Sequence, residues 1–271
     1  MKLKNIIKNK INDAIYSCKL NTIFYKRDRL SNRYLNGTGI EIGALHRPLW
    51  TSKYAKVLYL DRMDKDAAIK IFPDLQSEII IPDIIADGFT LAEITNNQYQ
   101  FCIANHVLEH SPNPLQVLKN WIRVLAPNGI LFFSVPLAQK CFDRGRAITS
   151  LEHLIYDYQI YSQNDLYEIA KKNREHYHEW LMISDPNIYK SRGAKPLNYS
   201  PQKINELLDK MTLKNAEIHF HTFTFSSLKR LIKYFVNQFN EAEKNININI
   251  MECTIRKGEI ICILKKINTY P

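Results

Sequence analysis

The sequence predicts an α/β protein built on a doubly wound, mostly parallel sheet of seven strands that ends in an antiparallel hairpin. Three observations indicate this fold: β-rich runs alternate with helical ones, a glycine turn follows the first run, and the chain closes with two strands joined at Lys257-Gly258. A long segment rich in Tyr, His and charge interrupts the alternation. We interpret it as a helical insertion over the carboxyl edge of the sheet, where such folds bind ligands.

The first half of the chain is expected to supply the parallel strands. Between the last two of them, "SPNPLQVLKNWIRVLAPNG" has apolar residues at helical spacing. Ser111 is expected to cap this helix, and Pro127-Asn128-Gly129 to end it. The strands are expected at residues 38–42, 57–60, 79–85, 101–104 and 130–135.

The end of the chain is predicted to complete the sheet. A short strand at 216–221 precedes the amphipathic helix "SSLKRLIKYFVNQF", which Ser226 or Ser227 is expected to cap. Two strands joined by a tight turn follow. An antiparallel hairpin on an otherwise parallel sheet is an uncommon topology, so it narrows the candidate folds.

The composition is that of an ordinary soluble globular protein. Of 271 residues, 45% are hydrophobic and 24% charged, and no apolar run approaches the roughly 20 residues that span a membrane. The N-terminus is basic without the apolar core of a secretory signal, so a cytoplasmic location is expected. The five cysteines form no Cys-x-x-Cys pair. Neither a disulfide framework nor a metal site is therefore expected.

The net charge of +10 is concentrated at the start of the chain. Residues 1–36 hold six lysines and three arginines against two aspartates, which accounts for +7. The remainder is close to neutral, which argues against a nucleic-acid groove. The basic segment is predicted to be a helix, either solvated and capping the domain or in contact with a membrane surface, an acidic partner or a phosphorylated substrate.

The turn after the first strand carries the first chemical signal. Gly43 ends that strand and lets a ligand approach the backbone closely. Asp61 ends the second strand, where a carboxylate can accept hydrogen bonds from ribose hydroxyls. An NAD(P)-dependent oxidoreductase is an alternative, but it needs a fuller glycine fingerprint than Ala44-Leu45-His46 supplies, and it does not predict the terminal hairpin.

These motifs resemble those of class I S-adenosylmethionine-dependent methyltransferases. "GIEIGA", "VLYLD" and "IIADG" are similar to the first three motifs of that family, and residues 99–136 resemble its fourth-strand, helix and fifth-strand block. "FDRGRAITSLEHLIYDY" and "HFHTFTFSSLKRLI" further resemble a bacterial subgroup associated with glycosyltransferase and surface-polysaccharide genes. The resemblance implies a Rossmann-like methyltransferase fold with S-adenosylmethionine as cofactor.

The resemblance also implies how the first two strands hold that cofactor. The backbone around Glu41, Gly43 and Ala44 would face its methionine and ribose parts. Asp61 would bind the ribose hydroxyls, and Arg62 would flank the adenine. Ala44 stands where the family has its second motif glycine, so this loop is expected to differ in detail.

The next two strand ends would complete the cofactor site. Asp87 would accept a hydrogen bond from the adenine amino group, and Gly88 and Phe89 would wall the ring. Asn105 and His106 would lie against the methionine or the methyl group. The resemblance therefore divides the chain into a basic helical segment, a cofactor-binding core, a substrate-binding insertion, and a last helix with the hairpin, at 1–36, 37–137, 138–222 and 223–271.

The insertion is expected to bind the acceptor and to supply a general base. Histidine has the pKa suited to accepting a hydroxyl proton, and His153 and His221 are the candidate bases. His219 and His221 are expected to project to one side of a strand. Cationic and aromatic side chains could hold an anionic or sugar acceptor. The candidate acceptor-binding residues are Arg47, Lys140, Asp143, Arg144, Arg146, Tyr158 and His219.

The predicted function is O-methylation of a small sugar, nucleotide-linked or phosphorylated precursor of a bacterial capsule or lipopolysaccharide, by in-line methyl transfer. No nucleic-acid partner is expected. Besides the oxidoreductase, a non-catalytic methyltransferase-fold scaffold or partner subunit is an alternative. The intact Glu41, Gly43, Asp61 and Asp87 argue against it, because they are the residues that cofactor binding needs.

Overall fold

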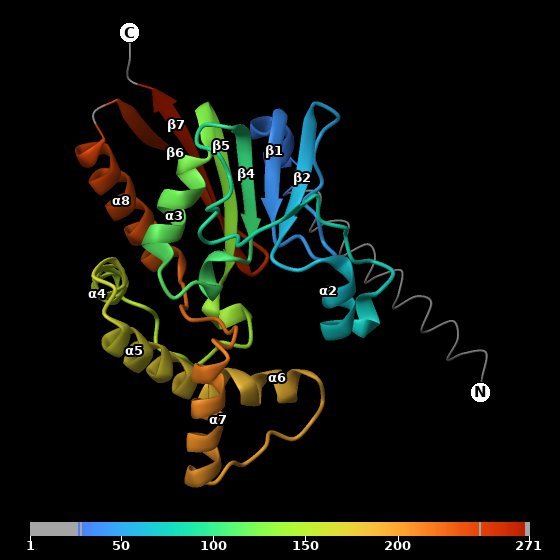
Figure 1. The fold of residues 1–271 in the computed structure, drawn as a ribbon, viewed down its shortest axis with the longest axis vertical. Helices are drawn as coiled ribbons and strands as arrows, with labels where there is room; N and C mark the ends of the chain where they lie inside the picture. The colour runs from blue at the N-terminus through green and yellow to red at the C-terminus, as the bar shows by residue number, and fades with distance from the viewer. Residues whose placement is uncertain (1–26, 28, 244, 269–271) are drawn as a thin grey trace, which may run out of the picture.

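The computed structural model describes residue 27 and residues 29–243 and 245–268. They form a seven-stranded sheet in the order β3-β2-β1-β4-β5-β7-β6 (Figure 1). Strands β1 to β5 are parallel, and β7 pairs antiparallel with both β5 and β6. The predicted fold class is thereby confirmed. The strands are β1 Gly37–Ile42, β2 Ala55–Asp61, β3 Ile84–Ile85, β4 Tyr99–Asn105, β5 Leu125–Pro136, β6 Ile246–Arg256 and β7 Glu259–Asn268.

Helices cover the sheet and its carboxyl end. In Figure 1, α3 and α8 lie along one face, whereas α5, α6 and α7 lie beyond the carboxyl end of the sheet. The segment between β5 and α8 is helical, as expected of the insertion, and includes a π-helical turn at Trp180–Ser184. The α-helices are α2 Lys65–Ile71, α3 Pro114–Arg123, α4 Leu151–Ser162, α5 Leu166–Glu179, α6 Asp185–Ser191, α7 Pro201–Leu213 and α8 Phe225–Ala242.

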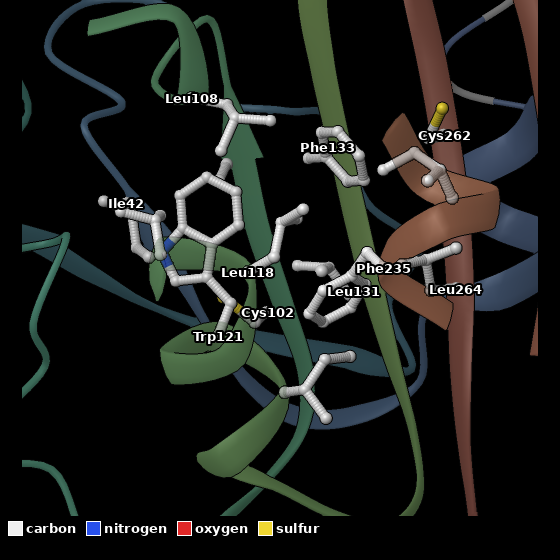
Figure 2. Packing of buried hydrophobic residues seen from close by; sticks show 14 of the residues in the cluster. Ile42, Cys102, Leu108, Leu118, Trp121, Leu131, Phe133, Phe235, Cys262 and Leu264 are labelled. Carbon is white, nitrogen blue, oxygen red and sulfur yellow. The ribbon is translucent and has the colours of Figure 1, made fainter. Parts of the chain in front are cut away.

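The strands bury both faces because apolar residues run continuously along them. In β5, Phe132 and Phe133 are both fully buried but belong to clusters on opposite faces. Figure 2 shows the larger cluster, where Trp121 of α3 and Phe235 of α8 pack with Phe133. Leu35 belongs to the smaller cluster on the other face. This two-sided burial fixes the strand ends that carry the site.

Several predicted element boundaries are wrong. The run at 79–85 contains only a two-residue strand, because Pro82 has no N–H and Ile80 donates to the Leu45 carbonyl instead of a ladder partner. Asn113, not Ser111, caps α3 through the N–H of Gln116. Thr224, not Ser226 or Ser227, caps α8 in a reciprocal capping box with Ser227.

The end of α3 is set by a tertiary contact. The helix ends at Arg123, and Pro127-Asn128-Gly129 lies within β5 and does not form the helix stop. The ammonium group of the buried Lys266 donates to the carbonyl oxygens of Ile122 (3.1 Å) and Leu125 (2.7 Å). A side chain from β7 thus binds one carbonyl in the last turn of the helix and one at the start of β5.

The expected strand at 216–221 does not form. The N–H groups of Phe220 and His221 both donate to the carbonyl oxygen of Glu109, at 2.7 and 3.2 Å. The guanidinium of Arg146 donates to the carbonyls of His219 (2.7 Å) and Phe220 (3.0 Å). Because these groups take the backbone hydrogen bonds, the segment joins no sheet.

The predicted amphipathic helix at the basic N-terminus lies almost wholly outside the described residues. Residues 29–34 are helical, and Arg27 pairs with Glu259 of β7. No helix in the described part of the chain is long and apolar enough to cross a membrane.

Candidate active site

A cavity of about 580 Å³ lies where the carboxyl ends of the parallel strands meet the insertion, and its volume suits a small-molecule ligand. Strand ends form one wall, and residues of α4, α5 and the segment before α8 form the other. The lining residues are Ile42, Gly43, Leu45, Leu60, Asp61, Arg62, Met63, Phe72, Asp87, Gly88, Phe89, His106, Val107, His110, Pro112, Tyr161, Asn173, Tyr177, Asn215, Ala216, Glu217 and Phe220.

The turn after β1 brings backbone to the cavity wall. Gly43 has φ +66°, and a Cβ there would lie 3.3 Å from Cγ2 of Val107, so both conformation and space favour glycine. The buried carboxylate of Glu41 accepts the N–H of Leu49 and so holds the following loop. Burial raises the pKa of Glu41 to about 7. Glu41 therefore shapes the turn without lining the cavity, and Leu45 lines it where Ala44 does not.

Asp61 and Arg62 line the cavity at the end of β2. Oδ1 of Asp61 accepts the N–H of Met63 at 3.2 Å, which orients the carboxylate. Arg62 pairs with Glu217, which lies on the opposite wall just before α8. Both side chains are 49% exposed, so the pair contributes little to stability. It links the two walls at the solvent-exposed side of the cavity.

The segment after β3 is hydrogen-bonded to α3. Oδ1 of Asp87 accepts the N–H groups of Phe89 (2.7 Å) and Thr90 (3.0 Å). Nε1 of Trp121 donates to the carbonyl of Gly88 at 2.8 Å. A Cβ on Gly88 would come within 2.4 Å of Cγ2 of Ile42, so the turn after β3 leaves room only for glycine there. Asp87 is thus both the turn residue and a cavity residue.

His106 is a cationic group in the cavity wall. Its Nε2 lies 2.9 Å from Glu259 and its Nδ1 lies 3.5 Å from Glu109. Burial alone would lower the pKa of His106, but hydrogen bonding and the charges of these two carboxylates outweigh it and raise the pKa to about 9. The neighbouring Asn105 does not line the cavity, because its amide oxygen accepts a hydrogen bond from Ser134 at 3.0 Å.

The insertion contributes aromatic and polar groups to the other wall. The side chains of Tyr161 and Asn173 are hydrogen-bonded at 3.1 Å, and both line the cavity beside Tyr177. His110 lies between the two walls and packs edge-on against His219, with ring centroids 4.6 Å apart. Burial lowers the pKa of His110 below its ordinary value of 6.5, so its ring is neutral and able to accept a proton at neutral pH.

The contacts of His106 with Glu259 and Glu109 predict that the stability of the protein depends on pH. The pKa of His106 is raised in the folded state, so its stabilising contribution is complete below about pH 6.5 and is lost as the pH rises through about 9. We expect the free energy of unfolding to fall over that interval, and His106→Gln to flatten the fall. Urea unfolding at both pH values measures this. The exposed His178→Gln is the control and is expected to show the same fall as the wild type. A fall in the free energy of unfolding that is unchanged in His106→Gln would contradict the assignment.

Comparison with known proteins decides the family. A family model described as a methyltransferase domain matches residues 30–235, which is most of the chain. The chain belongs to this methyltransferase family. No curated protein matches the sequence significantly.

Among solved structures, a SAM-dependent methyltransferase from Aquifex aeolicus is 8% identical, with 86% of this chain and 84% of that chain covered and a TM-score of 0.40. A SAM-dependent methyltransferase from Thermotoga maritima is 10% identical, with 93% and 95% covered and a TM-score of 0.39. These two likenesses are too remote to add an argument about the cavity.

Seven of the ten predicted cofactor residues line the cavity of this methyltransferase. Glu41, Ala44 and Asn105 do not. The roles of all ten residues toward a cofactor stay predictions. The structure does bring seven of them together from the ends of four strands. The seven are Gly43, Asp61, Arg62, Asp87, Gly88, Phe89 and His106.

Three predicted acceptor residues form a buried network beside the cavity. Nδ1 of His219 lies 2.5 Å from Oδ2 of Asp143, and Arg146 donates to Oδ1 of Asp143 at 3.0 Å. Arg146 also pairs with Glu179 of α5. Burial would raise the pKa of Asp143, but His219 and Arg146 lower it to about 2. This network ties α5 to the segment before α8 and lies behind the cavity wall.

The remaining predicted acceptor residues lie elsewhere. Arg47, Lys140 and Arg144 are exposed and do not line the cavity. Tyr158 accepts a hydrogen bond from Lys119 at 2.6 Å, in a second cavity between α3, α4 and α8. None of the four reaches the site in this structure.

The two predicted bases are also away from the cavity. His221 is fully buried and His153 is partly exposed, and neither lines the cavity. Their rings lie 5.7 Å apart in a separate cluster. His219 and His221, expected to serve one site, contact different groups because the segment forms no strand. His110, which the sequence analysis did not select, lines the cavity instead.

Sequence reasoning missed most of the second wall. His110 falls within "NHVLEH", next to residues that it did select, and this proximity was the available signal. Glu217 and Asn215 carry no motif, and only the packing of the insertion brings them to the cavity. Tyr161 and Asn173 are 12 residues apart, on two helices that face each other.

Proposed function

We propose that this methyltransferase uses S-adenosylmethionine to methylate an oxygen atom of a small acceptor. The observation that carries the proposal is one cavity bounded by Gly43, Asp61 and Asp87, each at the carboxyl end of a different parallel strand. Carboxylates at the ends of two adjacent strands suit a nucleoside, whose ribose hydroxyls and adenine amino group are hydrogen-bond donors.

The residues present fit that cofactor. Gly43 leaves the first turn without a side chain, in a conformation that a larger residue would strain. Asp61 would hold the ribose, and Asp87 with Phe89 the adenine. His106, whose two ring nitrogens face Glu259 and Glu109, would lie against the methionine part. The turn has no cluster of glycines for a pyrophosphate, and a sulfonium amino-acid cofactor needs none.

The mechanism follows from the opposite wall. The bound cofactor supplies a methyl group activated by a sulfonium. His110 is neutral at neutral pH and lies between the walls, so a ring nitrogen can accept the proton of an acceptor hydroxyl. Tyr177 and Phe220 shield the cavity from water, and the Tyr161–Asn173 pair orients the acceptor.

The acceptor in this proposal is a sugar, nucleotide-linked or phosphorylated precursor of a bacterial surface glycan. Its support is the resemblance of the insertion motifs to the polysaccharide-associated subgroup, together with hydroxyl, amide and aromatic groups of the kind that bind sugars. An anionic acceptor would rely on Arg62, because the cations predicted to bind the acceptor lie outside the cavity.

Removing the Asp61 carboxylate tests the cofactor assignment. Asp61→Ala is expected to weaken S-adenosylmethionine binding at least about tenfold, since a charge-assisted hydrogen-bond pair is worth about 1.5–3 kcal/mol. Isothermal titration measures the affinity, with Glu93→Ala as control because Glu93 is exposed and outside the cavity. Unchanged affinity in Asp61→Ala would refute the ribose assignment.

The same titration separates the alternatives. Wild-type protein that binds NAD(H) and not S-adenosylmethionine would favour the oxidoreductase, and binding of neither would favour the scaffold. Incubation with S-adenosylmethionine and glycan precursors, followed by mass spectrometry, tests the acceptor through the gain of one methyl group. A gain on none of the sugar or phosphorylated precursors would refute the acceptor class.

A further inference from the structure

Four potential metal ligands from three separate segments meet behind the insertion wall of the cavity. His153 and Asp157 lie four residues apart on one face of α4, His176 lies on α5, and His221 precedes α8. One donor atom from each lies within 4.8 Å of the other three. All but His153 are buried. The cluster is independent of the residues that line the cavity.

Three separations between the donor atoms are close to those around a four-coordinate zinc ion. Nε2 of His153 lies 3.2 Å from both Nε2 of His176 and Oδ2 of Asp157. Nε2 of His221 lies 3.7 Å from Oδ2 of Asp157. Zinc–ligand bonds of about 2.0–2.1 Å at tetrahedral angles place neighbouring donor atoms about 3.3 Å apart.

The cluster is not satisfied by its own hydrogen bonds. Only the His153–His176 contact has hydrogen-bond geometry. Nε2 of His221 and Oδ2 of Asp157 are buried and have no hydrogen-bond partner. The His221 side chain has no exposed surface, and the Asp157 side chain is 2% exposed. Buried polar atoms without partners are rare in native proteins, and both of these point toward the other donors.

The chemistry of the four side chains also suits a transition metal. Three imidazoles and one carboxylate favour zinc or a similar transition metal over the oxygen-seeking Mg²⁺ and Ca²⁺.

We propose that His153, Asp157, His176 and His221 bind one Zn²⁺ ion. Four protein ligands close the coordination sphere, so the ion is structural and does not hold a substrate. It joins α4, α5 and the segment before α8, which together carry Tyr161, Tyr177 and Phe220 of the cavity wall. The site departs from the expectation, drawn from the cysteine pattern, that the chain holds no metal.

Metal content tests the site directly and without methyl-transfer activity. The full chain is expressed without a histidine tag and dialysed against metal-free buffer. Inductively coupled plasma mass spectrometry is then expected to find about one zinc ion per chain. His176→Ala and His221→Ala are expected to lose it. His178→Ala is the matched control, because His178 lies on the same helix and is exposed. The proposal would be overturned if the wild type held no zinc even after zinc was added and the excess removed. It would also be overturned if His178→Ala lost as much zinc as the two ligand variants.

A second measurement decides the matter if the histidine variants fail to fold. Wild-type protein stripped with a chelator is reloaded with Co²⁺, which reports its coordination by visible absorption. An intense band of tetrahedral nitrogen and oxygen coordination supports the site. The weak absorption of octahedral, solvent-bound Co²⁺ would overturn it. Asp157→Asn, which keeps the size of the side chain, is expected to shift the band, and an unchanged band would exclude Asp157 as a ligand.

Discussion

Replacing His110 with alanine is expected to lower kcat by about 10²–10⁴-fold, the usual contribution of a general base, while cofactor affinity stays within about twofold. His110 is the histidine that lines the cavity between the strand ends and the insertion and has a pKa below its ordinary value. It is placed to take a proton without holding the nucleoside. Steady-state kinetics with an acceptor that the enzyme methylates give kcat, and titration of S-adenosylmethionine gives the cofactor affinity, so the two effects are measured separately.

The pH profile sharpens this prediction. Because the pKa of His110 is lowered, wild-type kcat is expected to hold through neutral pH and to fall only as the pH drops through that lowered value. The variant is expected to lack this acidic limb. His178→Ala serves as control, since that side chain is exposed and away from the cavity. A normal kcat in His110→Ala, with the acidic limb intact, would assign the base elsewhere.

Replacing Trp121 with alanine is expected to destabilise the protein by about 3–5 kcal/mol, the usual cost of emptying a buried aromatic site. Trp121 is fully buried in the larger core cluster, 6.2 Å from the ring of Phe133 (Figure 2). Its Nε1 also holds the Gly88 carbonyl in the predicted adenine wall. Weaker S-adenosylmethionine binding is therefore expected together with the loss of stability.

Two further substitutions separate packing from hydrogen bonding at this position. Trp121→Phe keeps most of the apolar volume and leaves the Gly88 carbonyl without its donor, for an expected cost of about 1–3 kcal/mol. Trp50→Ala removes a side chain that is 55% exposed, so it is expected to change stability by less than about 0.5 kcal/mol. Urea unfolding measures all three. Similar losses in Trp121→Ala and Trp50→Ala would show that burial of Trp121 does not carry the effect.

The sequence predicted best those parts of the fold that depend on local pattern. The apolar runs around Phe101 and Phe132 are strands in the structure, and Lys257-Gly258, both with positive φ, forms the predicted hairpin turn. These features follow from neighbouring residues alone. The end of α3 could not be predicted in this way, because Lys266, 144 residues away, donates to the Ile122 carbonyl in its last turn.

The wall of the cavity that the strand ends form was largely predictable, because strand ends can be read from apolar runs. Gly43, Asp61 and Asp87 each follow an apolar run, and parallel strands bring their carboxyl ends to one edge. The wall that the insertion forms was not predictable in detail. Whether Arg146 reaches a ligand or the carbonyls of His219 and Phe220 depends on how the insertion folds back, which no local pattern specifies.

The sequence by itself determined the alternation of strands and helices, the terminal hairpin and most of the strand ends that line the cavity, because apolar pattern, glycine conformation and turn residues act over a few residues. Only the tertiary structure decided which histidine faces the cavity and which are buried together. His219 and His221 are two residues apart, yet one contacts Asp143 and the other Asp157. Their partners come from distant segments, so long-range packing, and not spacing, assigns their chemistry.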